Sequence, residues 1–339
     1  MLADIIVGLQ YGDEGKGKVS LCLSKQEDTD YDICLRFNGG PNAGHTVYHN
    51  GQKIVLHQIP CGIINNKISI IGSGCVVDLG KLTHEIDSLK KIGIPVENLL
   101  KIAYNTHVIY TKHINEDVNK DVAGSTGSGI RPVNRDKYDR CGKRICDLDS
   151  NYLKGLIGDV NIIDPVYLLN KKDTKVLCEG AQGFELDIDY GNYPYVTSTH
   201  CCSGFVFNSG ISPKSVNKVY GAAKIYNTYV GNMQFQPEDD NLKKLAIIGE
   251  EFGSTTGRAR QCNWMDLDRL KKAIMVNGVT DLIINKCDIL KQLNVFKLIE
   301  NNQIKEFNEW TVFKNYVTES LKDFVDVENI VYSENKDRI

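Results

Sequence analysis

The sequence predicts an α/β fold with a large central, mostly parallel β-sheet, flanking helices and small inserted subdomains. Short apolar runs alternate with helical stretches along the chain, as in parallel sheets with crossover helices. The first apolar run leads directly into a glycine- and lysine-rich loop over residues 10–18, as in nucleotide-binding folds. Neither a linker nor an internal repeat divides the 339 residues, so we expect residues 1–339 to form one domain with insertions.

The expected elements follow from apolar runs, helical spacing and capping residues. A strand over residues 4–9 precedes a helix over residues 16–24. Asp266 can cap a helix that ends at Gly278 in a left-handed turn. Polar residues 291–330 carry only a weak pattern. The remaining strands are expected over residues 33–37, 55–57, 68–71, 175–178 and 280–284, with a helix over residues 82–92.

Composition excludes several classes of protein. Hydrophobic residues make up 42% and charged residues 24%, an ordinary globular mix. The net charge of −3 provides no basic field for nucleic acid. Neither a membrane span nor a signal peptide is expected from the apolar runs. The eleven cysteines include no CxxC pair, which favours reduced thiols in a cytoplasmic protein over a zinc site.

The loop over residues 10–18 carries the strongest chemical signal. Its glycines let backbone amides approach a phosphate, and the following helix start adds partial positive charge. Lys16 or Lys18 can reach terminal phosphates. Val19 stands where a Walker A loop has the Ser or Thr that holds magnesium. Asp13, inside the loop, is therefore the expected metal ligand.

Two further motifs favour nucleotide chemistry. Residues 285–288 read Asn-Lys-Cys-Asp after a strand; the Asp288 carboxylate can accept hydrogen bonds from guanine N1–H and its 2-amino group. Alone, this motif is more often a plain β-turn, but beside a phosphate loop the base-binding interpretation is favoured. His45 follows a Gly-Gly turn, where it can act as a general acid toward a phosphoryl oxygen.

Two arginine-containing loops offer binding sites for anions. In residues 254–260, hydroxyl groups precede Arg258 and Arg260, which suits a small carboxylate because guanidinium forms bidentate pairs. A solvated basic loop is the alternative. Residues 124–129 resemble a second phosphate loop followed by several arginines, and a flexible linker is the alternative there.

Together these motifs resemble the adenylosuccinate synthetase family, in its short archaeal or viral form. The matching blocks, in family order, are residues 12–18, 42–46, 179–183, 186–189, 193–198, 255–258 and 286–288. The resemblance implies GTP-dependent ligation of L-aspartate to IMP through 6-phosphoryl-IMP, giving adenylosuccinate, GDP and phosphate in AMP synthesis. It also implies Mg²⁺ as cofactor and a homodimer.

The resemblance implies a role for each matching residue. The catalytic residues would be Asp13 as base, His45 as acid, and Lys16 and Gln182 as stabilising groups, with Asp13 and the Gly44 carbonyl as metal ligands. The GTP-binding residues would be Gly12, Glu14, Gly15, Lys16, Gly17, Lys18, Gly44, Thr46, Lys286, Asp288 and Ser333. The IMP-binding residues would be Asp13, Asn42, Ala43, Gly44, His45, Thr126, Arg140, Arg144, Gln182, Thr197 and Arg258, with Arg140 reaching the neighbouring subunit's site. The aspartate-binding residues would be Thr255, Thr256, Gly257, Arg258 and Arg260.

Two alternative functions stay open at this point. A dGMP-using 2-aminoadenylosuccinate synthetase shares the motifs, but such relatives replace the loop aspartate, so Asp13 favours IMP. A GTP-binding protein without ligase activity would leave His45, Gln182 and the arginine loop unexplained. The C-terminal residues 333–338 lack the family's Gly-Pro pair, which weakens the prediction of that wall of the base pocket.

Overall fold

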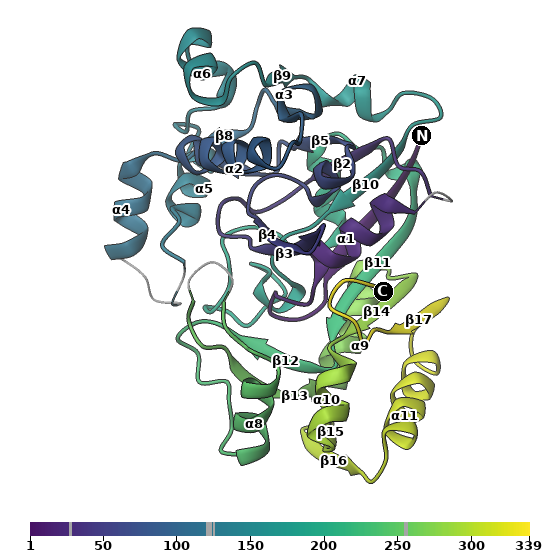
Figure 1. Cartoon of the computed structure of the whole chain (residues 1–339). Coiled ribbons are helices and arrows are strands. Elements are labelled where there is room, and N and C mark those ends of the chain that lie inside the picture. The colour runs from purple at the N-terminus through teal and green to yellow at the C-terminus, as the bar shows by residue number, and fades with distance from the viewer. Residues whose placement is uncertain (27–28, 120–123, 125, 254–256) are drawn as a thin grey trace.

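A computed structural model describes residues 1–26, 29–119, 124, 126–253 and 257–339 (Figure 1). Within these residues, nine strands form one sheet in the order β17-β14-β11-β1-β10-β2-β5-β7-β9, with every neighbouring pair parallel. The strands are β1 (Leu2–Gly8), β2 (Ile33–Arg36), β5 (Ile68–Ile71), β7 (Leu100–Ala103), β9 (Asn161–Ile163), β10 (Lys175–Glu179), β11 (Val216–Lys224), β14 (Asp281–Asn285) and β17 (Asn329–Tyr332). The parallel sheet confirms the predicted fold class.

The strand order reverses around β1. The chain first adds β2, β5, β7 and β9 on one side, returns to insert β10 beside β1, and then adds β11, β14 and β17 on the other side. Ligands of open parallel sheets bind at the carboxyl ends of the strands where the order reverses. The loops after β1, β10, β11 and β14 are therefore the expected site.

Smaller sheets and helices surround the central sheet. The other strands are β3 (His45–His49) with β4 (Gln52–Leu56), β6 (Val76–Val77) with β8 (His107–Val108), and the four-stranded sheet of β12 (Tyr226–Tyr229), β13 (Gln261–Asp266), β15 (Phe296–Glu300) and β16 (Gln303–Phe307). The helices are α1 (Lys16–Lys25), α2 (Leu79–Lys91), α3 (Val96–Leu99), α4 (Thr111–Asn119), α5 (Ile130–Tyr138), α6 (Ser150–Ile157), α7 (Pro165–Leu169), α8 (Asp240–Ile248), α9 (Leu267–Asn277), α10 (Cys287–Leu293) and α11 (Trp310–Lys322). Among the described helices, none is long and apolar enough to span a bilayer.

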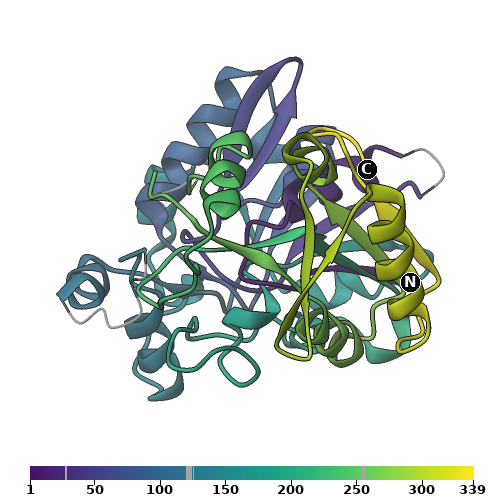
Figure 2. The ribbon, with the colours of Figure 1, turned by 90° about the horizontal axis from the view of Figure 1, so that it is seen from below.

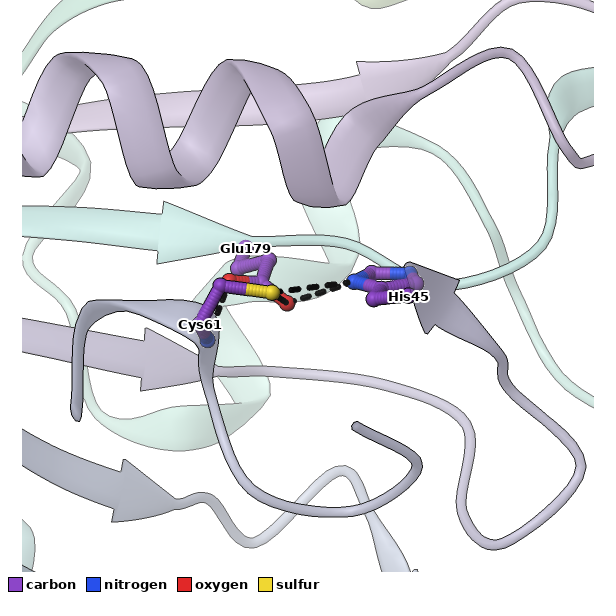
Figure 3. A group of neighbouring side chains, drawn as sticks. All are labelled: His45, Cys61 and Glu179. Atoms are coloured by element: carbon purple, nitrogen blue, oxygen red, sulfur yellow. Dashed lines mark hydrogen bonds and ion pairs between the residues drawn. The ribbon is translucent and has the colours of Figure 1, made fainter. Parts of the chain in front are cut away.

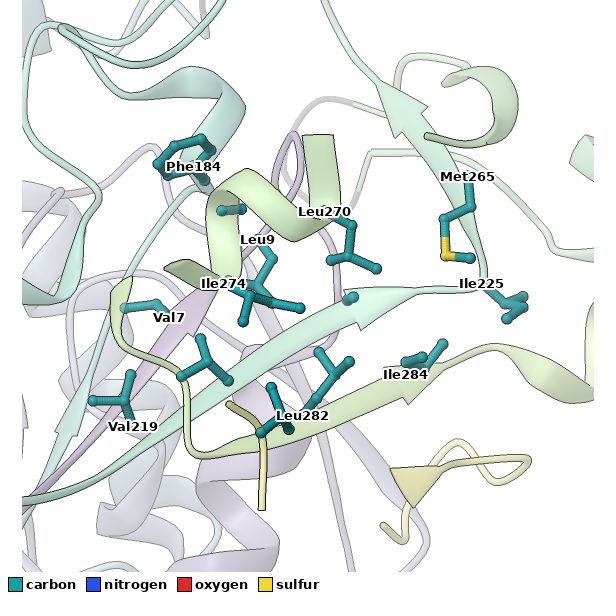
Figure 4. Packing of buried hydrophobic residues seen from close by; sticks show 14 of the residues in the cluster. Val7, Leu9, Phe184, Val219, Ile225, Met265, Leu270, Ile274, Leu282 and Ile284 are labelled. Carbon is teal, nitrogen blue, oxygen red and sulfur yellow. The ribbon is translucent and has the colours of Figure 1, made fainter. Parts of the chain in front are cut away.

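The core forms on both faces of β1, because side chains alternate along a strand. Ile6 packs with Val19 of α1 in one buried cluster. Val7 belongs to the larger cluster on the other face, together with Leu270 and Ile274 of α9 (Figure 4). Helices on both faces thus bury β1 and fix where its terminal loop emerges.

Most predicted elements are confirmed to within a few residues. Helix α9 begins after Asp266, whose Oδ1 accepts a hydrogen bond from Arg269 N at 3.0 Å, and it ends at Gly278 with φ of +60°. The strand expected over residues 55–57 is part of the β3–β4 hairpin. The weakly patterned residues 291–330 form β15, β16 and α11, which pack together (Figure 2), and lead into β17 at the edge of the main sheet.

Candidate active site

A cavity of about 830 Å³ opens where the loops after β1, β10, β11 and β14 meet. Most predicted site residues line it: Gly12, Asp13, Glu14, Gly15, Lys16, Gly17, Lys18, Asn42, Ala43, Gly44, His45, Thr46, Thr126, Gln182, Thr197, Arg258, Arg260, Lys286 and Asp288. Gly257, Ser333, Arg140 and Arg144 are described but are not part of its lining. Thr255 and Thr256 lie outside the described residues.

The loop after β1 is held from within by Glu14. The buried carboxylate accepts hydrogen bonds from Gln10 N at 3.0 Å and from Gly12 N at 2.9 Å. Its other oxygen lies 2.5 Å from Lys16 Nζ. Gly17 is required where the loop meets β3, because a Cβ there would lie 2.7 Å from the Cβ of His45. These contacts fix the conformation of the loop and place Lys16 at the cavity wall.

Asp13 belongs to a chain of alternating charges. Its backbone has φ of +60°, a region that Asp tolerates better than most side chains. Arg260 bridges two carboxylates, with Nε 2.7 Å from Asp13 Oδ2 and Nη1 2.5 Å from Glu251 Oε2. The buried Lys224 Nζ lies 3.0 Å from the same Glu251 oxygen. This network orients Asp13 and balances the buried charges.

The pKa of Glu251 reflects this network. Burial alone would raise the pKa of the Glu251 carboxyl, but the charges of Lys224 and Arg260 outweigh burial and lower it to about 2. Glu251 is therefore an anion at neutral pH. Its negative charge holds the cationic Arg260 against Asp13.

His45 is positioned by a buried carboxylate (Figure 3). Its Nδ1 lies 2.6 Å from Glu179 Oε1, and Arg36 Nη2 lies 2.6 Å from the same oxygen. The second Glu179 oxygen accepts hydrogen bonds from Ser20 Oγ at 2.5 Å and from Cys61 N at 2.9 Å. Because Nδ1 faces Glu179, Nε2 lies on the opposite edge of the ring. His45 also lines the cavity.

The ring of His45 is neutral at physiological pH. Burial and the Arg36 charge lower the pKa of His45 to about 4, against the opposing effect of Glu179. The carboxylate of Glu179, the Cys61 thiol and the ring lie close enough to hold a metal ion. However, the Arg36 guanidinium already pairs with that carboxylate. We therefore interpret Glu179 as the residue that positions the His45 ring, and not as a metal ligand.

Several buried polar atoms at the cavity find no hydrogen-bond partner among the described residues. They are both amide atoms of Gln182, Asn42 Oδ1, Ser198 Oγ and Asn285 Oδ1. Buried polar groups are normally paired, and each unpaired one costs free energy. Their grouping around one cavity indicates that a polar ligand completes their hydrogen bonds.

The predicted base-binding turn joins the phosphate loop. Asn285 Nδ2 donates to Glu14 O at 2.7 Å, which connects the end of β14 to the loop after β1. Lys286 has φ of +65°, and its Nζ donates to Gly249 O at 2.9 Å. The exposed Asp288 lies in the first turn of α10 and faces the cavity. The turn over residues 285–288 and the loop after β1 are therefore contiguous at the cavity.

The two lysines of the loop have different partners. Lys16 pairs with Glu14, whereas Lys18 Nζ donates to Ser333 Oγ at 2.8 Å and to Asn335 O at 2.9 Å. Burial lowers the pKa of Lys18 to about 8. Ser333 is thus connected to the site through Lys18 although it does not line the cavity.

The remaining predicted arginines are divided between two regions. Arg258 lines the cavity, and its Nη1 donates to Gly124 O at 3.0 Å. Arg140 is exposed on the segment after α5 and has φ of +61°. Arg144 pairs with Asp147 at 3.0 Å. Within this chain, the structure brings Arg258 to the cavity but not Arg140 or Arg144.

Sequence reasoning missed the supporting charges. Local sequence patterns indicate no role for Lys224, Glu251 or Arg36, and they mark Glu179 only as the first residue of a matching block. A charged residue at the end of a buried strand is a signal that could have found Lys224 and Glu179, which end β11 and β10. Glu251 lies in a loop whose contacts the local sequence does not reveal.

The amino-acid sequence is similar to one protein family and to individual proteins of that family. The family model described as adenylosuccinate synthetase matches residues 5–160 and 152–334. The adenylosuccinate synthetases of Phocaeicola vulgatus and Bacteroides thetaiotaomicron are each 39% identical, over 88% of this chain and 80% of the relative.

Solved structures agree in fold. A fully ligated adenylosuccinate synthetase from Plasmodium falciparum has a TM-score of 0.88 at 28% identity, covering 99% of this chain and 98% of the other. Cyanophage S-2L succinoaminodeoxyadenylate synthetase, bound to dGMP and dATP, has a TM-score of 0.76 at 20% identity, covering 99% and 93%. At that identity, the cyanophage structure supports the fold alone.

Proposed function

The chain belongs to the adenylosuccinate synthetase family, and from this premise we propose how its own residues carry out the family's reaction. The activity is the GTP-dependent ligation of L-aspartate to IMP in purine biosynthesis. A GTP-binding protein without ligase activity and a dGMP-using enzyme are not favoured, because the matched family and its relatives are adenylosuccinate synthetases.

We assign the substrates to three parts of the cavity. The guanine base of GTP lies at Lys286 and Asp288, and its phosphates follow the loop after β1 toward Lys16. IMP lies against Asn42, Gln182 and Thr197, where the unpaired amide groups supply hydrogen bonds. L-Aspartate binds near Gly257, Arg258 and Arg260, because guanidinium suits carboxylates; the predicted Thr255 and Thr256 belong to the same loop.

In the first step, the oxygen at C6 of IMP becomes a leaving group. The Asp13 carboxylate takes the proton from N1, so that negative charge develops on O6. O6 attacks the γ-phosphorus of GTP, the bond to the bridging oxygen breaks, and GDP departs. Lys16 and the loop amides stabilise the charge on the transferred phosphoryl group.

His45 assists phosphoryl transfer through Nε2. Glu179 fixes the ring by accepting from Nδ1–H, and the incoming polyphosphate favours the imidazolium form. The protonated Nε2 can then donate to a phosphoryl oxygen as charge develops. In the second step, the amine of aspartate attacks C6, loses a proton, and displaces phosphate to give adenylosuccinate.

The oxygen donors beside the loop fit Mg²⁺. The Asp13 carboxylate and the main chain of Gly44 both face the cavity, and Mg²⁺ prefers hard oxygen ligands together with substrate phosphates and water. We propose that these residues hold it. When bound, Mg²⁺ would neutralise phosphate charge.

One observation carries the proposal: five buried unpaired polar atoms, on Gln182, Asn42, Ser198 and Asn285, belong to residues that line one cavity, and Asp13, His45 and the turn over residues 285–288 line it too. The test is the absorbance change as a 6-oxopurine becomes a 6-aminopurine. We expect turnover only when GTP, IMP and L-aspartate are all present. Phosphate release from GTP at the same rate without IMP, or faster turnover with dGMP, would contradict it.

We also propose a cytoplasmic homodimer in which Arg140 enters the partner's IMP site. The exposed position of Arg140 outside its own cavity supports this, and the eleven free thiols suit a reducing compartment. Sedimentation should give a dimer, and Arg140→Ala should raise the KM for IMP. A fully active monomer would contradict the homodimer.

A further inference from the structure

The C-terminal tail, residues 333–339, is anchored between the phosphate loop and the base-binding turn. Ser333 N donates to Ile284 O at 2.8 Å, and Cys287 N donates to Ser333 O at 3.2 Å. These bonds attach the start of the tail to β14 and α10, the elements that flank Lys286. The end of the tail lies beside α1 (Figure 1), where Cys22 Sγ contacts Asp337 O at 3.5 Å.

Lys18 joins this tail to the phosphate loop. Its side chain is 7% exposed, and its ammonium group donates to Ser333 Oγ at 2.8 Å and to Asn335 O at 2.9 Å. An ammonium group has three donors, so the tail takes most of its hydrogen-bonding capacity. Lys16 and Lys18 both line the cavity, but Lys16 pairs with Glu14 of the loop itself and makes no contact with the tail that the structure describes. We therefore assign Lys16 to the phosphates and Lys18 to the tail.

The tail forms part of the base end of the cavity. Asn335 and Lys336 line the cavity, as do Asp288 and Ile289. Lys336 Nζ also lies 5.1 Å from the ring centre of Tyr48, on the β3–β4 hairpin. The tail therefore spans the base end from the base-binding turn to the hairpin, and Lys18 holds it through the hydrogen bonds to Ser333 and Asn335.

We propose that Lys18 is a positioning residue that makes the site selective for guanine, by holding the tail as a wall of the base subsite. This rests on the proposed placement of GTP. Asp288 can discriminate guanine from adenine only if the base cannot shift away from it. Selectivity for GTP over ATP is the difference between the two binding free energies. If the wall fixes the base beside Asp288, an adenine base leaves the Asp288 carboxylate without its hydrogen bonds, which weakens the binding of ATP.

The test compares Lys18→Met, Ser333→Ala and the double variant, with Lys25→Met as control. Lys25 is an exposed lysine in the last turn of the same helix. In Lys18→Met, we expect the KM for GTP to rise about tenfold with a smaller change in kcat, and the GTP-to-ATP ratio of kcat/KM to fall about tenfold. Ser333→Ala should shift both in the same direction; it also removes the hydrogen bond from Ser333 Oγ to Arg338 O at 2.8 Å. Because the contact between Lys18 and Ser333 can be lost only once, the double variant should lose less than the sum of the two single variants.

The opposite pattern would overturn the proposal. If Lys18 neutralises phosphate, its loss lowers kcat and affects GTP and ATP equally, while Ser333→Ala has no effect. If Lys18→Met does not fold, Ser333→Ala alone decides through the GTP-to-ATP ratio. Wild-type turnover with GTP, IMP and aspartate tests the proposed function separately, so the two failures are distinguishable.

Discussion

At the residue scale, the chemistry depends on a few charged groups that other charges hold in place. Arg260 connects Asp13 to Glu251, and Glu179 holds His45. That most of the predicted site residues line one cavity could be anticipated from sequence, because they lie in short contiguous motifs; their roles in the reaction stay a proposal. The supporting residues could not be anticipated, since Glu179 lies 134 residues beyond His45 along the chain, and only the folded sheet brings the two together.

Removing the proposed base tests the first step. In Asp13→Ala, we expect turnover to fall by about 10²–10⁴-fold, the usual contribution of a general base, while GTP binding stays measurable by calorimetry. Asp159→Ala, at an exposed position by the end of α6, serves as the control. Substantial residual turnover in the purified Asp13 variant would rule out its role as the base.

Removing the charge at Asp288 tests base recognition. An amide offers one acceptor oxygen and a donor group where the carboxylate offers two acceptor oxygens. Asp288→Asn should therefore bind guanine less well and lower the ratio of kcat/KM for GTP over ATP. Asp159→Asn, at an exposed position by the end of α6, is the matched control. An unchanged GTP-to-ATP ratio in Asp288→Asn would refute the assignment.

At the scale of elements, local sequence patterns predict those helices and strands whose ends depend on interactions between residues close together in the chain. Helix α9 was predicted with both ends, because its cap at Asp266 and its glycine at Gly278 act within a single turn. The strand β17 was missed, because its residues alternate between exposed and half-buried and give little apolar signal. Pairing with β14 makes it a strand, and this pairing is a property of the whole sheet.

The cap of α9 gives a prediction for stability. Asp266→Ala removes the acceptor for Arg269 N and should lower the free energy of unfolding by about 1 kcal/mol. Asp266→Asn keeps a good capping oxygen and should cost much less. Urea denaturation of the two variants measures the difference. Equal losses would show that the charge, and not the cap, matters.

At the scale of the whole molecule, the site links the two sides of the central sheet. Loops from both sides of β1 meet in one cavity, and the C-terminal tail reaches back to the first helix. Lys18 and Ser333 are 315 residues apart in the chain, so no local pattern could predict their contact. That residues 1–339 form one folding domain stays a prediction.

Buried ionisable groups also make the free energy of unfolding depend on pH. The pKa of His45 is lowered to about 4 in the folded chain, so between its ordinary value of about 6.5 and 4 the unfolded chain binds the additional proton. Stability should therefore fall as pH drops through this range. Glu179 and Glu251, each with a pKa lowered to about 2, extend the loss from about pH 4.5 downward.

Urea denaturation between pH 7 and pH 4 checks this dependence. His45→Asn keeps a donor for Glu179 but cannot take up the proton, so its stability should decline less than that of the wild type over this range. His84→Asn, at an exposed position on α2, should behave like the wild type. An identical decline in His45→Asn and wild type would contradict the assignment.

The path of one oxygen atom tests the central claim most directly. IMP labelled with oxygen-18 at C6 is converted with GTP and L-aspartate, and the released phosphate is analysed by mass spectrometry. If O6 is phosphorylated and then displaced, the label appears in the phosphate. Unlabelled phosphate, formed by attack of water on GTP, would contradict the account.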